Sequence, residues 1–121
     1  MSCHAARQEL EKKLRRKLDR SLIRAERRVK KLVALARSER DAGNLPAVPP
    51  DFNCKYEPRM STSPLKRWLS TTHQVVIRRS TGKTRTIHFE FDRACEGNVQ
   101  DFLAELSKAF AMAAEWASSQ I

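Results

Sequence analysis

Apolar residues recur at helical spacing through the first third of the chain, between residues 5 and 42. This stretch contains neither Pro nor Gly, and it is dominated by Leu, Ala, Glu, Lys and Arg, which all favour helices. The pattern predicts one helix about 55 Å long, at about 1.5 Å per residue. Gly43 and Asn44 follow as a left-handed cap, and Pro46 prevents the helix from continuing.

One side of this expected helix carries an apolar seam whose spacings alternate between four and three. Its members are Leu18, Leu22, Ala25, Val29, Leu32 and Ala36. Such a heptad pattern is typical of a coiled coil, and the seam could pair with a second copy or fold against the rest of its own chain. We expect a homo-oligomer, such as a dimer, formed through this helix.

All five prolines fall between residues 46 and 64, with Ser and Thr around them. This composition predicts an extended, Pro-rich connector over residues 44–67 without a regular element of its own. Phe52, Tyr56 and Trp68 could fix it to a core as an ordered strap. The alternative is a free linker.

Residues 72–79 and 83–92 are rich in Val, Ile, Thr and Phe and are separated by a Ser-Thr-Gly loop. The pattern predicts a β-hairpin with Gly82 at the position that needs a positive φ. A three-residue loop places Val75 opposite Ile87 and gathers the apolar side chains on one face, whereas a two-residue loop would set phenylalanines against polar residues. We expect the apolar face to hold Val75, Ile77, Ile87, Phe89 and Phe91.

Asn98 can cap a final helix, in which apolar residues again follow at spacings of three and four. These residues are Val99, Phe102, Leu103, Leu106, Phe110 and Ala113. An isolated hairpin is only marginally stable in water, so we expect its apolar face to pack on this helix and on the near end of the first one. The predicted fold is α+β and has three parts: a long basic, coiled-coil-like N-terminal helix (1–43), a Pro-rich connector (44–67), and a core of β-hairpin and C-terminal amphipathic helix (68–121).

The charge of the chain is strongly positive and unevenly distributed. The sequence has 24 Lys and Arg against 14 Asp and Glu, a formal net charge of +10. Residues 1–43 hold 14 basic and six acidic side chains, whereas residues 44–121 hold ten and eight. A field of this sign attracts nucleic acid, anionic membranes or acidic proteins, so we expect a polyanion to meet the N-terminal third first.

On the side of the helix opposite the seam, cations recur at spacings of three and four and form a cationic ridge. Its members are Lys13, Lys17, Arg20, Arg24, Arg27 and Lys31. A charge run is most often a solvated helix face. This one lacks acidic partners that would neutralise it, because Asp19 and Glu26 interrupt it only weakly, so we expect it to contact a polyanion.

A second cationic cluster lies at the hairpin tip, residues 78–85, where four cations and three hydroxyls surround the turn. In the predicted register Arg79 is opposite Lys83, and like charges in that position repel. Their placement favours an anion between them, and guanidinium, ammonium and hydroxyl groups are donors that phosphate oxygens accept. We expect the tip to contact phosphates through Arg78, Arg79, Lys83 and Arg85.

Cysteines and histidines form no metal-binding or catalytic pattern in the sequence. Cys3, Cys54 and Cys95 are odd in number and widely spaced, which favours a reducing compartment over a disulfide framework. The hairpin register places His73 and His88 on opposite faces, which argues against a shared zinc ion. No nucleophile stands beside a base, so we expect no enzyme activity, no cofactor and no bound metal.

The function that these patterns favour is non-enzymatic binding of DNA or RNA backbone through the ridge and the tip. Aromatic residues are scarce near the cations, so stacking on single-stranded bases is not expected. No apolar run approaches the roughly 18 residues of a membrane span, and we expect a cytoplasmic, nucleoid or nuclear protein. The alternative is an interaction protein, an inhibitor or adaptor of a phage or mobile element, whose basic surface binds an acidic protein or a nucleoprotein complex.

Overall fold

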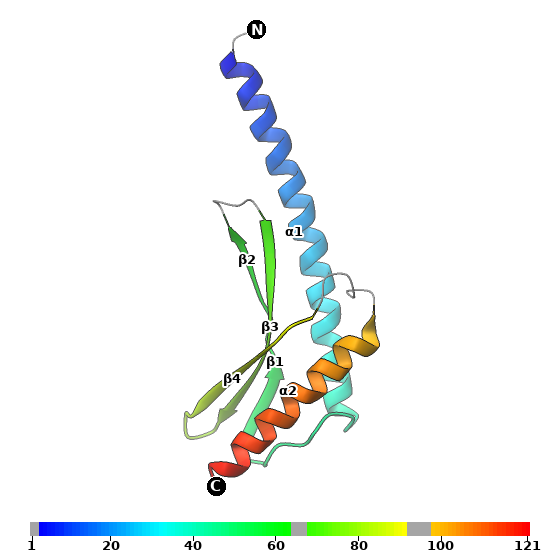
Figure 1. Cartoon of the computed structure of the whole chain (residues 1–121), viewed down its shortest axis with the longest axis vertical. Coiled ribbons are helices and arrows are strands. Elements are labelled where there is room, and N and C mark those ends of the chain that lie inside the picture. The colour runs from blue at the N-terminus through cyan, green and yellow to red at the C-terminus, as the bar shows by residue number, and fades with distance from the viewer. Residues whose placement is uncertain (1–2, 64–67, 92–97) are drawn as a thin grey trace.

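The computed structural model describes residues 3–63, 68–91 and 98–121, with the backbone alone for residues 61–63 and 68–70. The elements follow in the order α1 (Cys3–Asp41), β1 (Phe52–Tyr56), β2 (Arg59–Ser63), β3 (Trp68–Arg79), β4 (Thr84–Phe89) and α2 (Val99–Ser119), as Figure 1 shows. A long N-terminal helix, an antiparallel sheet that contains a hairpin, and a C-terminal helix confirm the predicted α+β fold.

The long helix ends where the sequence predicts. Gly43 has a φ of 77°, the left-handed conformation that favours glycine. The N–H of Asn44 donates to the carbonyl of Glu39 at 3.0 Å, and the N–H of Gly43 donates to that of Arg40 at 3.1 Å. These two bonds form a Schellman motif and satisfy carbonyl groups that a helix end leaves free.

The prediction of a Pro-rich connector without regular structure is wrong for residues 52–63, which contain β1 and β2. Both strands pair with β3 in one register, since Tyr56 lies opposite Val75 and Arg59 lies opposite Thr72. The two are therefore parts of one long strand with a break at Glu57 and Pro58.

Of the two alternatives for the connector, the structure shows the ordered strap. Phe52, Cys54 and Tyr56 alternate inward along β1 and are buried, so two of the three expected anchors do fix this segment to the core. The third, Trp68, opens β3, but its side chain lies outside the described part of the chain.

The β3–β4 hairpin has the predicted loop and register. Val75 pairs with Ile87, and the N–H of Arg79 donates to the carbonyl of Lys83 at 2.7 Å. Gly82 has a φ of 99°, as the three-residue loop requires.

The bounds of the hairpin differ from those predicted. β3 begins earlier than expected, at Trp68, and β4 ends at Phe89, whereas the predicted end of that strand, Asp92, lies outside the described residues. His73 pairs with Phe89, and paired residues share a face of the sheet. His88 precedes Phe89 in β4 and points to the other face, so His73 and His88 lie on opposite faces, as predicted.

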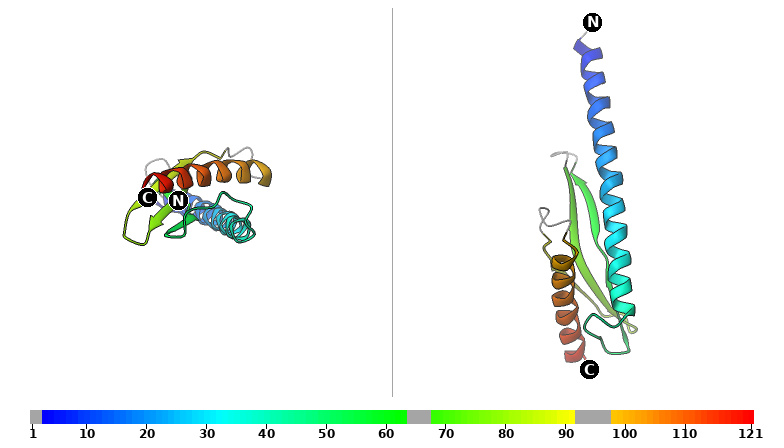
Figure 2. Two further views of the ribbon diagram at one scale, coloured as in Figure 1. Left: turned by 90° about the horizontal axis from the view of Figure 1, so that it is seen from below. Right: turned by 90° about the vertical axis from the view of Figure 1, so that its right-hand side faces the viewer.

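Both helices lie on one side of the sheet, and its other face is open, as the views in Figures 1 and 2 show. β3 is the central strand, with β1 and β2 along one edge and β4 along the other. The covered face carries Val75 and Ile77, both completely buried. The residues that alternate with them face away from the helices and are mostly polar.

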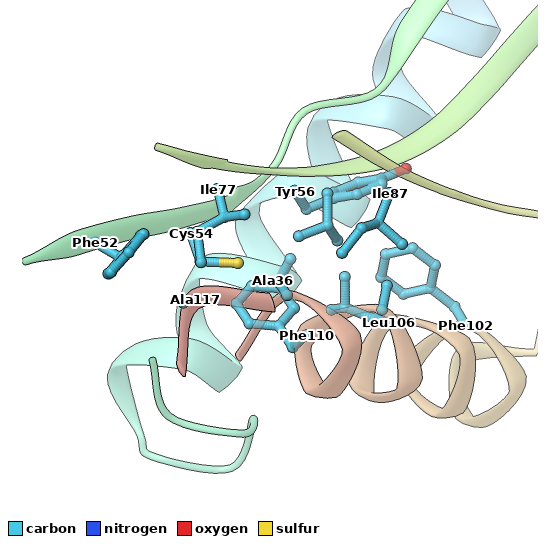
Figure 3. Packing of buried hydrophobic residues seen from close by; sticks show 13 residues of the cluster. Ala36, Phe52, Cys54, Tyr56, Ile77, Ile87, Phe102, Leu106, Phe110 and Ala117 are labelled. Atoms are coloured by element: carbon cyan, nitrogen blue, oxygen red, sulfur yellow. The ribbon is translucent and has the colours of Figure 1, made fainter. Parts of the chain in front are cut away.

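One hydrophobic cluster joins the covered face of the sheet to both helices (Figure 3). The ring of Phe102 lies 5.2 Å from that of Tyr56 and 5.6 Å from that of Phe91 between centroids. Ala36 brings the last turns of α1 into the same cluster. The prediction that the hairpin packs on the last helix and on the near end of the first one is therefore confirmed.

α2 begins at the predicted cap, because Oδ1 of Asn98 accepts from the N–H groups of Gln100 and Asp101 at 3.1 and 3.4 Å. One of its expected core positions is wrong. Val99 is 47 % exposed, since it opens the helix one turn before Phe102, where the ring contacts with the sheet begin.

α1 is longer than the core on which it packs, and its N-terminal part projects beyond the sheet and α2 (Figure 1). Every residue from Cys3 to Lys17 except Ala5 is exposed. The apolar seam is different, since its members from Ala25 to Ala36 are buried or half-buried within their own chain. Self-association through the seam stays a prediction.

Replacing Phe102 with Ala should cost about 3 to 5 kcal/mol of the free energy of unfolding, because this ring is completely buried and its loss leaves a cavity. Urea denaturation followed by circular dichroism measures the change. Val99→Ala on the same helix is the control and should change stability by less than about 0.5 kcal/mol. Equal effects of the two substitutions would contradict the packing of α2.

Candidate nucleic-acid interface

The cationic ridge lies on α1 and is open to solvent. All six members, Lys13, Lys17, Arg20, Arg24, Arg27 and Lys31, are exposed. None of the six forms an ion pair or a side-chain hydrogen bond within the described part of the chain. The positive charge of this row is therefore not neutralised by the described part of the protein.

The fold turns the ridge away from the core. Ala25 and Ala36 are buried on the sheet side of α1, and the ridge follows the opposite side of the same helix at spacings of three and four. From Lys13 to Lys31 it extends about 27 Å, at about 1.5 Å per residue. That length corresponds to about eight base pairs of duplex, so the row can meet several phosphates at once.

The hairpin tip is built differently, because three of its four cations already have partners in the protein. The guanidinium of Arg79 donates to the carboxylate of Asp51 at 2.9 Å and to the carbonyl of Gln120 at 3.1 Å. It also lies over the ring of Phe52, 5.3 Å from the centroid. Nζ of Lys83 donates to the side-chain oxygen of Gln120 at 3.3 Å.

The negative group expected between Arg79 and Lys83 therefore belongs to the same chain. Gln120 is the C-cap of α2, and the carbonyl groups at the end of a helix carry partial negative charge. Two cations at that point stabilise the helix end and reduce their own repulsion. An external anion is not needed to explain their placement.

Asp51 and Ser80 complete this contact between the tip and the strap. The hydroxyl of Ser80 donates to the Asp51 carboxylate, and the Ser80 N–H donates to the Asp51 carbonyl at 3.1 Å. The hydrogen bonds from Ser80 and Arg79 lower the pKa of the Asp51 carboxyl below its ordinary value. The tip, the strap and the end of α2 are thus joined by one polar network.

Arg78 lies on the open face of the sheet, where both of its terminal nitrogens donate to Glu57 at 2.7 and 3.0 Å. This bond lowers the pKa of the Glu57 carboxyl, with smaller contributions from Arg78 itself, Lys55 and Arg59 through charge. Arg85, the last cation of the tip, is exposed and has no ionic or hydrogen-bonded partner among the described residues.

The structure does not bring the two predicted cationic clusters together. The hairpin tip lies beside the C-terminus at one end of the molecule, whereas the ridge follows α1 away from that end (Figure 1). Sequence reasoning also missed Lys55 and Arg59, which share the open face with Arg78. The alternation of apolar and polar residues over positions 52–56 was the signal that could have placed these two cations on the open face of the sheet. The surrounding prolines obscured this pattern.

The described residues supply little else that resembles a functional site. They contain no group of three or more His, Cys, Asp or Glu side chains that could hold a metal ion. No helix within the described ranges is long and apolar enough to cross a membrane. Cys54 is buried, and its removal from water raises the pKa of its thiol to about 12, so it is a poor nucleophile at neutral pH.

Comparison with known protein families found no matching family, and comparisons with curated proteins and with solved structures found no significant match.

Asp51→Asn should lower the thermal midpoint at pH 7 more than at pH 3. Because the folded-state pKa of Asp51 is depressed below the ordinary 3.8, its contribution to stability is present above that value and is lost as the pH falls through the folded-state pKa. Thermal unfolding at both pH values measures the effect. Asp19→Asn, on the exposed side of α1, is the control and should shift the midpoint little at either pH. No loss at pH 7 would show that the network around Asp51 does not stabilise the fold.

Proposed function

We propose that this protein binds nucleic acid through the phosphate backbone and that the cationic ridge of α1 is its main contact. The observation that carries the proposal is the exposure of all six ridge cations on the side of α1 opposite its buried face, without an acidic partner among the described residues. The proposed partner is DNA or RNA, and no catalysis or cofactor is involved.

A row of exposed cations on one side of a helix is best suited to contact with phosphates. Each Lys or Arg that neutralises a phosphate releases a counterion, and this release supplies most of the free energy of non-specific binding. A straight helix with one charged side can lie along a groove or across the backbone without a change in the core. The projecting part of α1 is accessible for this purpose, since its residues from Cys3 to Lys17 are exposed except for Ala5.

Sequence-specific readout is not part of the proposal. α1 contains no Phe, Tyr or Trp on which an unpaired base could stack. Contacts to phosphates fix position and orientation but carry no base identity. We therefore propose binding with little sequence preference, in a reducing compartment that contains nucleic acid: the cytoplasm, a nucleoid or a nucleus.

The hairpin tip is a weaker candidate than the ridge. Phosphate could reach Arg78, Arg79 or Lys83 only by competing with bonds that these residues make to Glu57, Asp51 and Gln120. Arg85 has no such competitor among the described residues and remains the tip's best phosphate contact.

A second candidate function is binding to an acidic protein, as an adaptor or inhibitor would. Leu10 and Leu14 favour it, because they are 58 % and 38 % exposed and stand one helical turn apart on the projecting part of α1. Phosphates make no use of an apolar stripe, whereas an amphipathic protein partner would bury it.

Affinity for a generic duplex should fall steeply with salt, by about a thousandfold between about 50 and 200 mM if about six phosphates are contacted. Replacing Arg20, Arg24, Arg27 and Lys31 with Gln should weaken binding and flatten the slope of log affinity against log salt by about one unit per lost contact, while helix propensity stays high. Fluorescence anisotropy on duplex DNA, duplex RNA and single strands measures both quantities.

The matched control removes the same charge from other positions of α1, by replacing Lys12, Arg15, Lys30 and Arg37 with Gln. These four residues are also exposed but lie off the ridge. Equal losses of affinity in the two variants would show that binding depends on the net charge of α1 and not on the position of the cations along the ridge. If no nucleic acid binds more tightly than about 10 μM near 150 mM salt, the range of ordinary non-specific binding, the proposal is wrong. In the protein-adaptor alternative, Leu10→Ser and Leu14→Ser abolish capture of an acidic partner but leave anisotropy unchanged.

A further inference from the structure

β4 forms an outer edge of the sheet that the described chain leaves uncovered. β3 pairs with it on one side, and neither a strand nor a helix lies along its other side in Figure 1 or Figure 2. Its six residues, Thr-Arg-Thr-Ile-His-Phe, contain no Pro and a single charge. Natural edge strands are ordinarily protected by prolines, lysines, bulges or a covering element.

The register shows which backbone groups of β4 point outward. Arg79 bonds to Lys83 across the loop, and in an antiparallel ladder the bonded pairs alternate, so Arg85 and Ile87 direct their backbone groups toward β3. The backbone N–H and C=O groups that point away from the sheet are therefore those of Thr84, Thr86 and His88. None of these three makes a backbone hydrogen bond on that side within the described residues.

The part of the opposite edge that β1 forms is protected. The guanidinium of Arg40, in the last turn of α1, donates to the outward carbonyl of Cys54 at 3.3 Å. Pro49 accepts the N–H of Phe52 at 3.0 Å, and Pro58, which faces the same outer edge, has no N–H to offer there. β1 and β4 flank the same part of β3, and of these two strands β4 is the one whose outer edge is left available for pairing.

We propose that β4 pairs with β4 of a second copy of this chain, so that two sheets join into one across a twofold axis at Thr86. The pairing is antiparallel, as a twofold axis perpendicular to a sheet requires. Thr86 then lies opposite Thr86 of the second copy, and Thr84 lies opposite His88. The three pairs of outward groups form about six backbone hydrogen bonds.

A second copy fits this edge because the strand is complementary to itself in this register. Arg85 lies opposite Ile87 of the second copy, so the only charge of the strand does not meet its own image. The two Thr86 side chains share the open face, where paired threonines favour strand association. An unrelated acidic or basic strand would gain the same backbone bonds but no such match of side chains.

Sedimentation equilibrium between about 1 and 100 μM should show a dimer for the parent protein and a monomer for Thr86→Pro. Proline removes the outward N–H of Thr86 and blocks the edge, but it removes no bond to β3. Thr86→Val keeps the N–H and is the matched control, which should remain a dimer. The protein is first freed of nucleic acid with a high-salt wash, so failure here is distinct from failure of the proposed function.

Cross-linking tests the register even if Thr86→Pro fails to fold. In a Cys3→Ser, Cys95→Ser background, Thr86→Cys should form a disulfide-linked dimer under mild oxidation, because paired Cα atoms lie about 5.5 Å apart and disulfides need about 4.4 to 6.8 Å. Thr84→Cys is the control. Its partner position is His88, which places the two introduced thiols too far apart, so it should give no linked dimer.

Three results would overturn the inference. One is a parent protein that is monomeric at 100 μM and fails to cross-link at position 86. Another is cross-linking that is as efficient from position 84 as from position 86. The third is a Thr86→Pro variant that is folded and still dimeric while Leu10→Asp with Leu14→Asp is monomeric, which would assign the dimer to α1.

Discussion

Burial of one face of β3 is the constraint on which the other elements depend. Val75 and Ile77 are completely buried on it, and α2 and the end of α1 both reach the cluster that forms there. With 31 % charged residues and eight aromatic residues, the chain has few alternative apolar surfaces with which to build a core. A shift of β3 by one residue would turn this face toward solvent and leave the helices without a partner, so the three-residue loop is as important to the fold as the apolar residues are.

The cations of the protein divide into two groups that composition cannot distinguish. Arg79 and Lys83 hold the end of α2 and the strap, so their charge is used within the fold. The ridge cations, in contrast, are exposed on a helix whose opposite side already supplies the packing. Exposed ion pairs contribute little to stability, so selection for folding alone gives no reason for an unneutralised row of this length. This argument favours a partner for the ridge more than it does for the tip.

Patterns with a single strong period were predictable from the sequence, and contacts between distant segments were not. The bounds of α1, the Asn98 cap of α2, the Gly43 cap and the Val75–Ile87 register follow from local spacing and turn chemistry. β1 was missed because Phe52, Cys54 and Tyr56 make only a five-residue alternation inside a Pro-rich stretch. The partners of Arg79 are 28 and 41 residues away in sequence, and no local rule connects a hairpin tip with Asp51 or with the carbonyl of Gln120. The exposure of the ridge was predictable, because a helix with an apolar seam must turn its opposite side to solvent.

The proposed pairing of β4 determines where the two ridges of a dimer lie relative to each other. Both helices lie on one side of the sheet, so a twofold axis perpendicular to the sheet at Thr86 keeps both helix layers of the dimer on the same side. Because the paired strands are antiparallel and α1 runs along the length of the sheet, the two projecting helices point in opposite directions. A single long polyanion lying across that side would meet one ridge at each end. Binding at the first ridge would raise the effective concentration of nucleic acid at the second, so an extended duplex gains avidity that a fragment of about eight base pairs cannot.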